Sequence, residues 1–304
     1  MSPPDAFAAG AAFVDGAFVP VGQASVSVLD WGFTKSDATY DVVHVWRDGF
    51  FRLDAHLARF ARSLAALRLE IPYDAAQQAR ILAGCVRRAG LSEAYVALVA
   101  TRGVPLPGMP RRPSLMTNRF LAYAIPWVDA LPPETQTRGA HLVVAETPHR
   151  IPPDSIDPTV KNYHWGDLVQ GLFTAEAAGA DSVLLLDRQG DVTEGPGFNL
   201  FAVRDGRVLT PARGVLEGVT RQTVLEICAE LGVSAQACRL RRADLQAADE
   251  LFASTTAGGI VPVSRIDGRI LSNDRPGPLT LRIRDTYWAW HARERYRTPV
   301  TALL

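Results

Sequence analysis

The stretch Tyr40–Leu64, YDVVHVWRDGFFRLDAHLARFARSL, contains the signals of a strand, a hairpin and a helix in succession. Tyr40–Trp46 is rich in β-branched residues, and after an Asp-Gly turn the chain returns over Phe50–Leu53, which predicts a hairpin. Asp54 is a good N-cap, and apolar residues recur at helical spacing after it. Because hairpins stand beside helices, we expect an α+β fold and not a doubly wound parallel sheet.

The same mixture continues along the chain, without an internal repeat or a low-complexity segment. Further strands are expected over Ala11–Val21 (as a hairpin), Tyr95–Thr101, Arg119–Ile125, His141–Glu146, Ser182–Asp187, Asn199–Val203 and Glu250–Thr255. Further helices are expected over Asp74–Ala89, Tyr163–Ala178, Val219–Leu231 and Leu279–Tyr296. The segment 127–137 contains Pro132-Pro133 and predicts a linker between a small domain, 1–126, and a larger one, 138–304.

Composition excludes several classes of protein. The 304 residues suffice for one large or two medium domains, and 32 basic residues balance 32 acidic ones. A net charge of zero argues against a nucleic-acid binder or a general membrane-surface binder. Three cysteines without paired spacing (Cys85, Cys228 and Cys238) support neither a disulfide framework nor a zinc site. With no signal peptide read in Met1–Gly10 and no apolar stretch long enough to span a membrane, a cytoplasmic protein is expected.

The basic residues are unevenly divided between the two types. Thirty are arginines and only two, Lys35 and Lys161, are lysines. Codon bias toward arginine accounts for such a ratio. Chemistry that needs an amine nucleophile nevertheless has only two side chains to choose from.

Several common site motifs are missing from the sequence. There is no Walker loop, and Gly195-Pro196-Gly197 lacks the third glycine of a dinucleotide fingerprint. The six histidines form no HExxH motif, so no metal site is expected. A G-x-S-x-G nucleophile elbow is also absent.

Lys161 is the first candidate for chemistry. It ends a proline-bounded loop, Pro158–Asn162, directly before the helix expected at Tyr163–Ala178. An apolar neighbour, Val160, and the positive end of a helix dipole both favour the neutral amine over the ammonium. A neutral amine is what Schiff-base chemistry requires, although a solvated loop lysine fits the local pattern as well.

Four other features point to an anionic ligand or a ring, each with a plain structural alternative. Glu194, in the tight turn Thr193–Asn199, could pair with a protonated ring nitrogen or face solvent in a hairpin. Leu216–Arg221 opens a helix whose first amides could bind an anion, or it carries an ordinary glycine before a helix. Ser254–Gly259 suits phosphate or carboxylate binding, or forms a flexible turn. Arg59 could clamp an anion or lie on the surface.

Taken in order, these segments resemble one family over nearly the whole chain, from residue 12 to residue 295. The set is similar to the class IV pyridoxal-phosphate aminotransferases, which include branched-chain, D-amino-acid and (R)-selective amine transaminases. It comprises His56–Arg59, Lys161-Asn162, Thr193–Asn199, Leu216–Arg221 and Thr255–Gly258. The resemblance implies a two-domain fold type IV enzyme, with a small N-terminal α/β domain and a larger C-terminal α/β pseudo-barrel domain carrying the cofactor lysine. The implied cofactor is pyridoxal 5′-phosphate.

The resemblance also implies a role for each matched residue. Lys161 would form the internal aldimine and then carry the proton between Cα and the cofactor C4′, while Glu194 would keep the pyridine nitrogen protonated. Arg59, the amides of Val219 and Thr220, and Thr256 would hold the phosphate, and Leu216 would pack on the ring face. The substrate pocket would be lined by Tyr40, Val42, Tyr95, Trp165, Thr255 and Ala257.

Within the family, four stretches look most like the (R)-selective amine transaminases: Lys35–Val42, Phe50–Asp54, Asp157–Asn162 and Trp165–Leu168. D-amino-acid enzymes share Tyr40, where branched-chain enzymes usually carry Phe. The chain departs from the amine transaminases by having Lys35 for His and Ala97 for Glu. Their carboxylate-binding arginine lies early in the loop after Arg102-Gly103, whereas in this proline-rich loop (residues 103–113) Arg111 and Arg112 come later.

We therefore expect an aminotransferase that moves an amino group from an (R)-amine or amino acid to a 2-oxo acid such as pyruvate, with ping-pong kinetics. The alternatives are a branched-chain or D-amino-acid aminotransferase, an aminodeoxychorismate lyase that eliminates pyruvate, and a cofactor-free binding protein on the same fold. The resemblance further implies a homodimer with the active site near the interface, and neither nucleic acid nor membrane as a partner.

Overall fold

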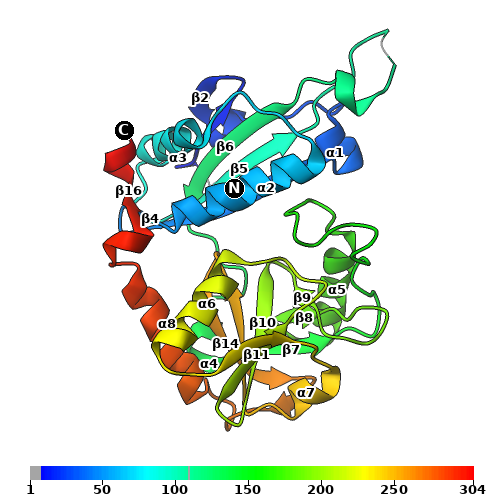
Figure 1. Ribbon diagram of the computed structural model, residues 1–304, viewed down its shortest axis with the longest axis vertical. Helices are drawn as coiled ribbons and strands as arrows, with labels where there is room; N and C mark the ends of the chain where they lie inside the picture. The colour runs from blue at the N-terminus through cyan, green and yellow to red at the C-terminus, as the bar shows by residue number, and fades with distance from the viewer. Residues whose placement is uncertain (1–7, 109) are drawn as a thin grey trace, which may run out of the picture. The chain divides into compact units, whose positions relative to one another are not determined.

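The computed structural model describes residues 8–108 and 110–304, and this part of the chain divides into two compact units (Figure 1). Unit 1 holds the described residues up to Val128, together with Val160–Tyr163 and His291–Leu304. Unit 2 holds Asp129–Thr159 and His164–Trp290. In this division residues 127–128 fall in unit 1 and residues 129–137 in unit 2, while Lys161 falls in unit 1; the expected domain boundaries stay a prediction. Lys161 falls in unit 1 because the backbone of the short segment around it pairs with a strand of that unit.

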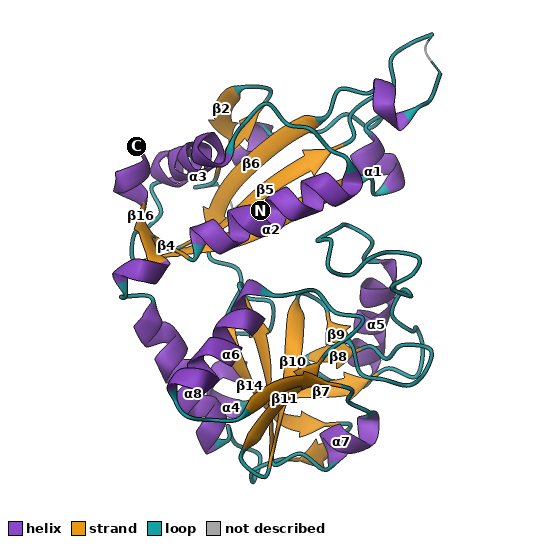
Figure 2. Ribbon diagram, in the orientation of Figure 1, coloured by secondary structure: helices purple, strands orange, loops and turns teal. Residues whose placement is uncertain are grey.

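Within the described residues, unit 1 contains a seven-stranded antiparallel sheet in the order β16-β4-β3-β5-β6-β1-β2. Figure 2 shows two of its paired strands, β5 and β6, side by side. Its strands are β1 (Ala11–Val14), β2 (Ala17–Pro20), β3 (Ala38–Trp46), β4 (Gly49–Phe51), β5 (Ala94–Thr101), β6 (Arg119–Pro126) and β16 (Arg297–Pro299). Its helices are α1 (Trp31–Lys35), α2 (Leu53–Leu67) and α3 (Ala75–Ala89), with 3-10 turns η1 (Val21–Gln23), η2 (Pro113–Leu115), η3 (Glu294–Tyr296) and η4 (Val300–Leu303). Both expected hairpins are present.

The two long helices of unit 1 begin differently. Helix α3 has the capping box that its sequence allows, with reciprocal bonds between Asp74 and Gln77, and it ends at Gly90 in the left-handed conformation. Helix α2 begins at Leu53, two residues earlier than an N-cap at Asp54 implies, so Asp54 lies in its first turn and does not cap it. There its carboxylate still complements the positive end of the helix dipole.

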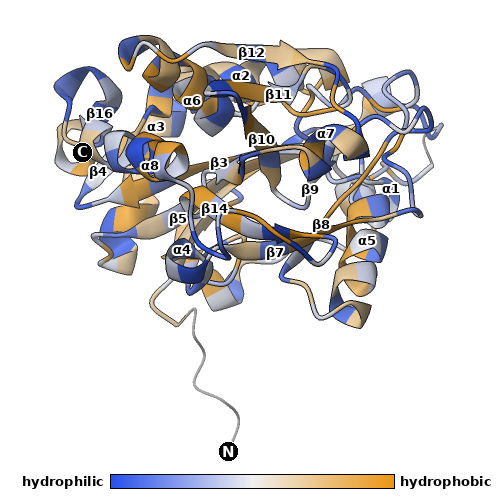
Figure 3. Cartoon of the chain, turned by 90° about the horizontal axis from the view of Figure 1, so that it is seen from below, coloured by the Kyte–Doolittle hydropathy of each residue, from blue (hydrophilic) through white to orange (hydrophobic). Residues whose placement is uncertain are grey.

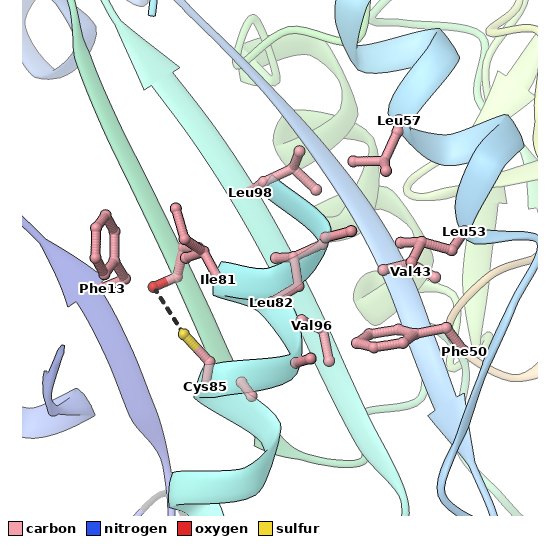
Figure 4. Close-up of a cluster of buried hydrophobic side chains, with 14 of the residues drawn as sticks. Phe13, Val43, Phe50, Leu53, Leu57, Ile81, Leu82, Cys85, Val96 and Leu98 are labelled. Carbon is pink, nitrogen blue, oxygen red and sulfur yellow. Dashed lines mark hydrogen bonds between the residues drawn. The ribbon is translucent and has the colours of Figure 1, made fainter. Parts of the chain in front are cut away.

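Helices α2 and α3 cover one face of the unit 1 sheet, and the core lies between the helices and the sheet (Figure 4). Val43 and Val45 of β3 point into this core together with Leu57 of α2. Because side chains alternate along a strand, Tyr40 and Val42 point to the opposite face of the sheet.

The described part of unit 2 contains a nine-stranded mixed sheet, in which β11–β12, β14–β7 and β7–β8 are parallel pairs. Its strands are β7 (Ala140–Val144), β8 (Ser182–Leu184), β9 (Glu194–Gly195), β10 (Phe198–Arg204), β11 (Arg207–Pro211), β12 (Ala235–Cys238), β13 (Glu250–Thr255), β14 (Gly259–Ile266) and β15 (Arg269–Ile270). Its helices are α4 (Thr135–Arg138), α5 (Gly166–Ala177), α6 (Val219–Glu230), α7 (Arg242–Gln246) and α8 (Pro278–Trp290). The expected α+β class is confirmed.

Two expected helices of unit 2 are shorter than predicted. Helix α5 begins at Gly166 and not at Tyr163, because 160–163 is extended against β3 of unit 1. Helix α8 ends at Trp290, after which the chain forms a 3-10 turn and the edge strand β16. Strands β12 and β14 were not expected.

Burial follows the hydropathy of the strands. Figure 3 colours much of β8 and β14 as hydrophobic, and all but one of the side chains in these two strands are buried. The core of unit 2 includes Leu142, Leu200 and Val263, from three strands of its sheet. In the described part of the chain, none of the helices combines the length and the apolar character that crossing a bilayer requires.

Candidate functional site

Backbone bonds fix the Lys161 segment to strand β3. Asn162 forms an antiparallel bridge with Thr39, and the carbonyl oxygen of Lys161 accepts bonds from the Thr39 hydroxyl at 2.6 Å and from the Tyr40 amide at 3.3 Å. The Lys161 amide donates to the Ser63 hydroxyl of α2 at 3.2 Å. The lysine is therefore held at its backbone by a strand and a helix of the same unit.

The Lys161 side chain lies on an aromatic face. Its Nζ is 4.3 Å from the centroid of the Tyr40 ring, which also stacks on Tyr163 with centroids 4.4 Å apart. Among the described residues, no carboxylate forms an ion pair with this amine. Because α5 begins only at Gly166, Lys161 does not directly precede a helix as predicted, and the helix dipole falls off before reaching it. The neighbour of the Lys161 amine is therefore the Tyr40 ring and not the start of a helix.

Arg59 lies in a buried network with Asp41 and His56. Its Nε and Nη2 each donate to Asp41, at 2.8 Å to Oδ2 and 2.8 Å to Oδ1, and His56 Nδ1 lies 2.8 Å from the same Oδ1. Burial opposes the charge on Asp41, but Arg59 and His56 outweigh it and hold the pKa of this carboxyl far below its usual value. Burial lowers the pKa of His56, which favours a neutral imidazole. Arg59 is thus no surface residue.

The other unit 1 candidates lie on β3 and β5. Val42 is buried and pairs in register with Ala97 of β5. Tyr95 is half-buried and stacks at 6.3 Å on Tyr123 of β6, and burial raises the pKa of its phenol above the usual range. The sheet face beside Lys161 therefore presents neutral aromatic and aliphatic groups, and Tyr123 and Tyr163 are members that the sequence did not single out.

Arg102, before the proline-rich loop, has structural partners. Its guanidinium donates to Asp37 at 2.8 Å and to the carbonyl oxygens of Arg68 at 2.8 Å and Leu67 at 2.6 Å. These bonds occupy the group and tie the loop entrance to the end of α2. Within the loop, Arg111 and Arg112 are exposed, and at the end of α1 Lys35 is exposed as well. None of these placements assigns a role to the loop or to Lys35.

In unit 2, Glu194 is buried in the short strand β9, which forms a hairpin with β10. Its Oε2 accepts the Leu216 amide at 2.9 Å and lies 3.5 Å from Asn199 Nδ2, which also donates to the Leu216 carbonyl at 3.0 Å. Glu194 is therefore not a solvent-facing hairpin residue. These bonds hold Glu194, the predicted partner of the pyridine nitrogen, next to Leu216, the predicted contact of the ring face.

Two glycines in these segments make room for side chains of the protein. A Cβ on Gly195 would lie 2.1 Å from the Phe198 ring, and one on Gly218 would lie 2.2 Å from Asn199 Oδ1. Helix α6 follows Gly218, which supplies no side-chain cap, so within the described residues the N-cap leaves the first amides, among them those of Val219 and Thr220, without the usual side-chain acceptor. An anion can bind at this helix start.

The remaining unit 2 candidates lie in turns. Thr255 ends β13 and its hydroxyl accepts the Ala257 amide at 3.2 Å, while the Ala257 carbonyl accepts the Ala130 amide at 2.8 Å. Thr256 lies within the same turn. Trp165 is half-buried immediately before α5, and Gly197 of the β9–β10 hairpin lies against its ring.

The structure adds two charged residues to the set, Arg150 and Asp167. Arg150 Nη1 donates to Asp167 Oδ2 at 2.7 Å, and its Nε and Nη2 lie 3.3 and 3.2 Å from Glu194 Oε1. Sequence reasoning missed both residues. One is an arginine among thirty, and the other is an ordinary acidic residue in the first turn of a helix.

The comparisons with known proteins agree on one family. The model described as "Amino-transferase class IV" matches residues 38–266. A putative branched-chain-amino-acid aminotransferase of Methanocaldococcus jannaschii is 33% identical over 278 residues, which cover 90% of this chain and 94% of that relative. A D-alanine aminotransferase of Bacillus licheniformis is 27% identical over 263 residues, or 86% of this chain and 90% of that relative.

Solved structures give the same result. The T.th. branched-chain amino acid aminotransferase complexed with N-(5′-phosphopyridoxyl)-L-glutamate has a TM-score of 0.87 at 31% identity, covering 96% of this chain and 98% of that one. The branched-chain aminotransferase of the archaeon Thermoproteus uzoniensis with norvaline has a TM-score of 0.86 at 29% identity, covering 95% and 99%. The chain belongs to the class IV aminotransferases, two-domain enzymes of fold type IV that use pyridoxal 5′-phosphate.

Proposed function

We propose that this enzyme transfers an amino group from an (R)-amine or an amino acid to a 2-oxo acid such as pyruvate, and that Lys161 is its catalytic residue. The observation that carries the proposal is the Lys161 amine, which lies on the Tyr40 ring without a carboxylate partner among the described residues. A lysine without a carboxylate partner does not have to break an ion pair before it acts as a nucleophile and a proton carrier.

The cofactor, when bound, supplies an electron sink for the carbanion formed at the substrate Cα. The residues present fit such a group. Glu194 offers a buried carboxylate for the ring nitrogen, and Leu216, bonded to it, is the proposed ring-face contact. For the phosphate we propose Arg59, Thr256 and the uncapped α6 amides of Val219 and Thr220.

The lining of the substrate pocket supports an amine donor. We propose that the pocket includes Tyr40, Val42, Tyr95, Trp165, Thr255 and Ala257. The unit 1 members are neutral, and the nearby cation Arg102 is occupied by Asp37 and backbone carbonyls. Neutral groups suit the apolar part of an amine donor. The 2-oxo acid brings a carboxylate into the same pocket, and because a charged group stripped of water needs a partner, we propose the turn at Thr255–Ala257 as its receptor. The alternative is a branched-chain or D-amino-acid aminotransferase, which the named relatives favour. An aminodeoxychorismate lyase is a further alternative.

A donor panel tests the substrate proposal. Both enantiomers of 1-phenylethylamine, D- and L-alanine, and L-leucine are each supplied with pyruvate or 2-oxoglutarate, and the ketone and the new amino acid are quantified. We expect (R)-1-phenylethylamine with pyruvate to react at least roughly 100-fold faster than the (S)-enantiomer, because a shaped pocket accepts one hand. Turnover of L-leucine alone would reassign the enzyme to branched-chain substrates. The lyase alternative needs a separate assay with aminodeoxychorismate as the sole substrate, in which release of pyruvate without amino transfer would indicate a lyase.

We also propose that the enzyme is a homodimer. Apolar side chains are exposed on and before α1: Val28 by 71%, Leu29 by 64% and Phe33 by 72%. The Trp31 amide at the start of this helix donates to the carbonyl of Gly103, so the helix and the loop entrance are linked. Exposed apolar groups gathered in one segment are typical of an interface. A fully active monomer in sedimentation coupled to an activity assay would contradict the dimer.

A further inference from the structure

Arg150, Asp167 and Glu194 form a buried charge cluster within unit 2. The Arg150 and Glu194 side chains are each 9% exposed and that of Asp167 is 7% exposed. One formal positive charge faces two formal negative charges, so the three side chains together carry a net charge of −1. Buried charge is costly unless an opposite charge compensates it. A cluster of this composition is therefore suited to receive one more cation.

Asp167 is fixed more firmly than Glu194 as a partner of Arg150. Its Oδ2 accepts the Ile151 amide at 2.8 Å in addition to the Arg150 bond at 2.7 Å, and its Oδ1 accepts the Leu168 amide at 2.8 Å. It also lies in the first turn of α5, where the helix dipole favours an anion. Asp167 consequently takes the shortest hydrogen bond of Arg150 and part of its charge.

Glu194 receives the longer contacts of Arg150, at 3.2 and 3.3 Å, both on Oε1. Its Oε2 is oriented by the Leu216 amide at 2.9 Å. Arg150 thus orients the carboxylate without neutralising it, because its charge is shared with Asp167. Burial disfavours the charge on Arg150, but Glu194 and Asp167 together raise the pKa of its guanidinium, so it stays protonated.

We propose that Asp167 and Arg150 are positioning residues that together set how much negative charge Glu194 offers to the ring nitrogen of the cofactor. The inference rests on the proposed role of Glu194. Because Arg150 also pairs with Asp167, it compensates the negative charge of Glu194 only in part. A proton on the ring nitrogen would compensate the remainder. Arg150, by contrast, reduces the uncompensated negative charge of Glu194 and holds its carboxylate in place.

The two residues should therefore act in opposite directions. Asp167→Asn removes a negative charge and leaves Arg150 to pair with Glu194 alone, which disfavours a protonated ring nitrogen. Arg150→Gln removes the positive charge but keeps a hydrogen-bond donor, which favours it. The double variant removes one charge of each sign and restores the net −1. A purely structural role predicts instead that both single variants harm binding alike and that the double variant is worst.

The test compares two cofactors. Apo-protein is titrated with pyridoxal 5′-phosphate and with its 1-deaza analogue, which carries C–H in place of the ring nitrogen, and the two Kd values are measured by absorbance. For Asp167→Asn we expect Kd for pyridoxal 5′-phosphate to rise at least about tenfold while Kd for the analogue is unchanged. For Arg150→Gln the ratio of the two Kd values should move the opposite way, and the double variant should return it toward wild type.

Asp181→Asn is the matched control, because Asp181 also pairs with an arginine, Arg138, and also accepts a backbone amide, that of His141. It should leave both Kd values unchanged. Single variants that shift the ratio in the same direction, or that weaken both cofactors equally, would overturn the inference. Failure of the proposed function looks different, because wild-type protein would then bind both cofactors equally or yield no borohydride adduct on Lys161.

Discussion

Replacing Lys161 by alanine should abolish transamination, with kcat falling by at least roughly 10⁴-fold. The change removes both the nucleophile that attaches the cofactor and the base that moves the substrate proton. The backbone contacts of the segment to Thr39 and Ser63 do not involve the lost side chain, so the fold should survive. The measurement is kcat with the best donor of the panel, together with circular dichroism of the variant.

Reductive trapping identifies the lysine directly. Borohydride treatment of the holoenzyme followed by peptide mapping should find the cofactor on Lys161. Lys35, the one other lysine in the sequence, lies exposed at the end of α1, and a Lys35→Ala variant should give the same adduct. An adduct on Lys35, or none, would refute the assignment of the catalytic lysine.

The second large effect should come from Asp41. Asp41→Asn takes a carboxylate from a fully buried network in which Arg59 donates two bonds of 2.8 Å to it. Breaking a buried ion pair by removing one partner costs about 3–5 kcal/mol, because the other charge stays buried. Urea denaturation should report a loss of that size. Cofactor affinity should fall as well, because the two bonds to Asp41 hold Arg59, the proposed phosphate ligand, in its orientation.

The stability from Asp41 should depend on pH in a defined direction. Its folded-state pKa lies below the ordinary value of 3.8, so the folded state releases the proton more readily than the unfolded chain. The contribution is therefore complete above that ordinary value and is lost as the pH falls toward the folded-state pKa. Between neutral pH and acid, wild-type protein should lose stability from this group while Asp41→Asn shows no such loss.

Asp15→Asn provides the control in the same unit. Asp15 pairs with Arg119, but its side chain is 72% exposed, and exposed pairs contribute less than about 1 kcal/mol. The two variants make the same chemical change at sites that differ in burial. Equal losses of stability would mean that burial of the Asp41 network has no energetic consequence.

The family, the cofactor and the α+β class were predictable from sequence because they depend on motif order along the chain. The turn around Glu194 and the helix start at Gly218 are local backbone features, and their glycines and prolines mark them. The hairpin of β3 and β4 and the capping box of α3 were predictable for the same reason.

Features that depend on long-range packing were not predictable. The pairing of Lys161 with β3 links residues 122 positions apart, and nothing in its proline-bounded loop indicates a partner strand. The same holds for Arg150 and Asp167, because their proposed role depends on Glu194, a third residue that lies on strand β9. Helix α5 was predicted too long because residues 163–165 fit helical spacing. In the structure the preceding segment is extended, because Asn162 pairs with Thr39 of β3.

The assembly of unit 1 from three separate parts of the chain has a consequence for biosynthesis. Strand β16 pairs with β4, although the two lie at opposite ends of the sequence. On the ribosome, strands β1 to β6 emerge first, but the segment with Lys161 and the edge strand β16 arrive only after unit 2 has begun to emerge or is complete. The first 128 residues expressed alone would therefore lack both an edge of their sheet and the lysine. Nascent enzyme should gain its amine chemistry only once strand β16 has left the exit tunnel.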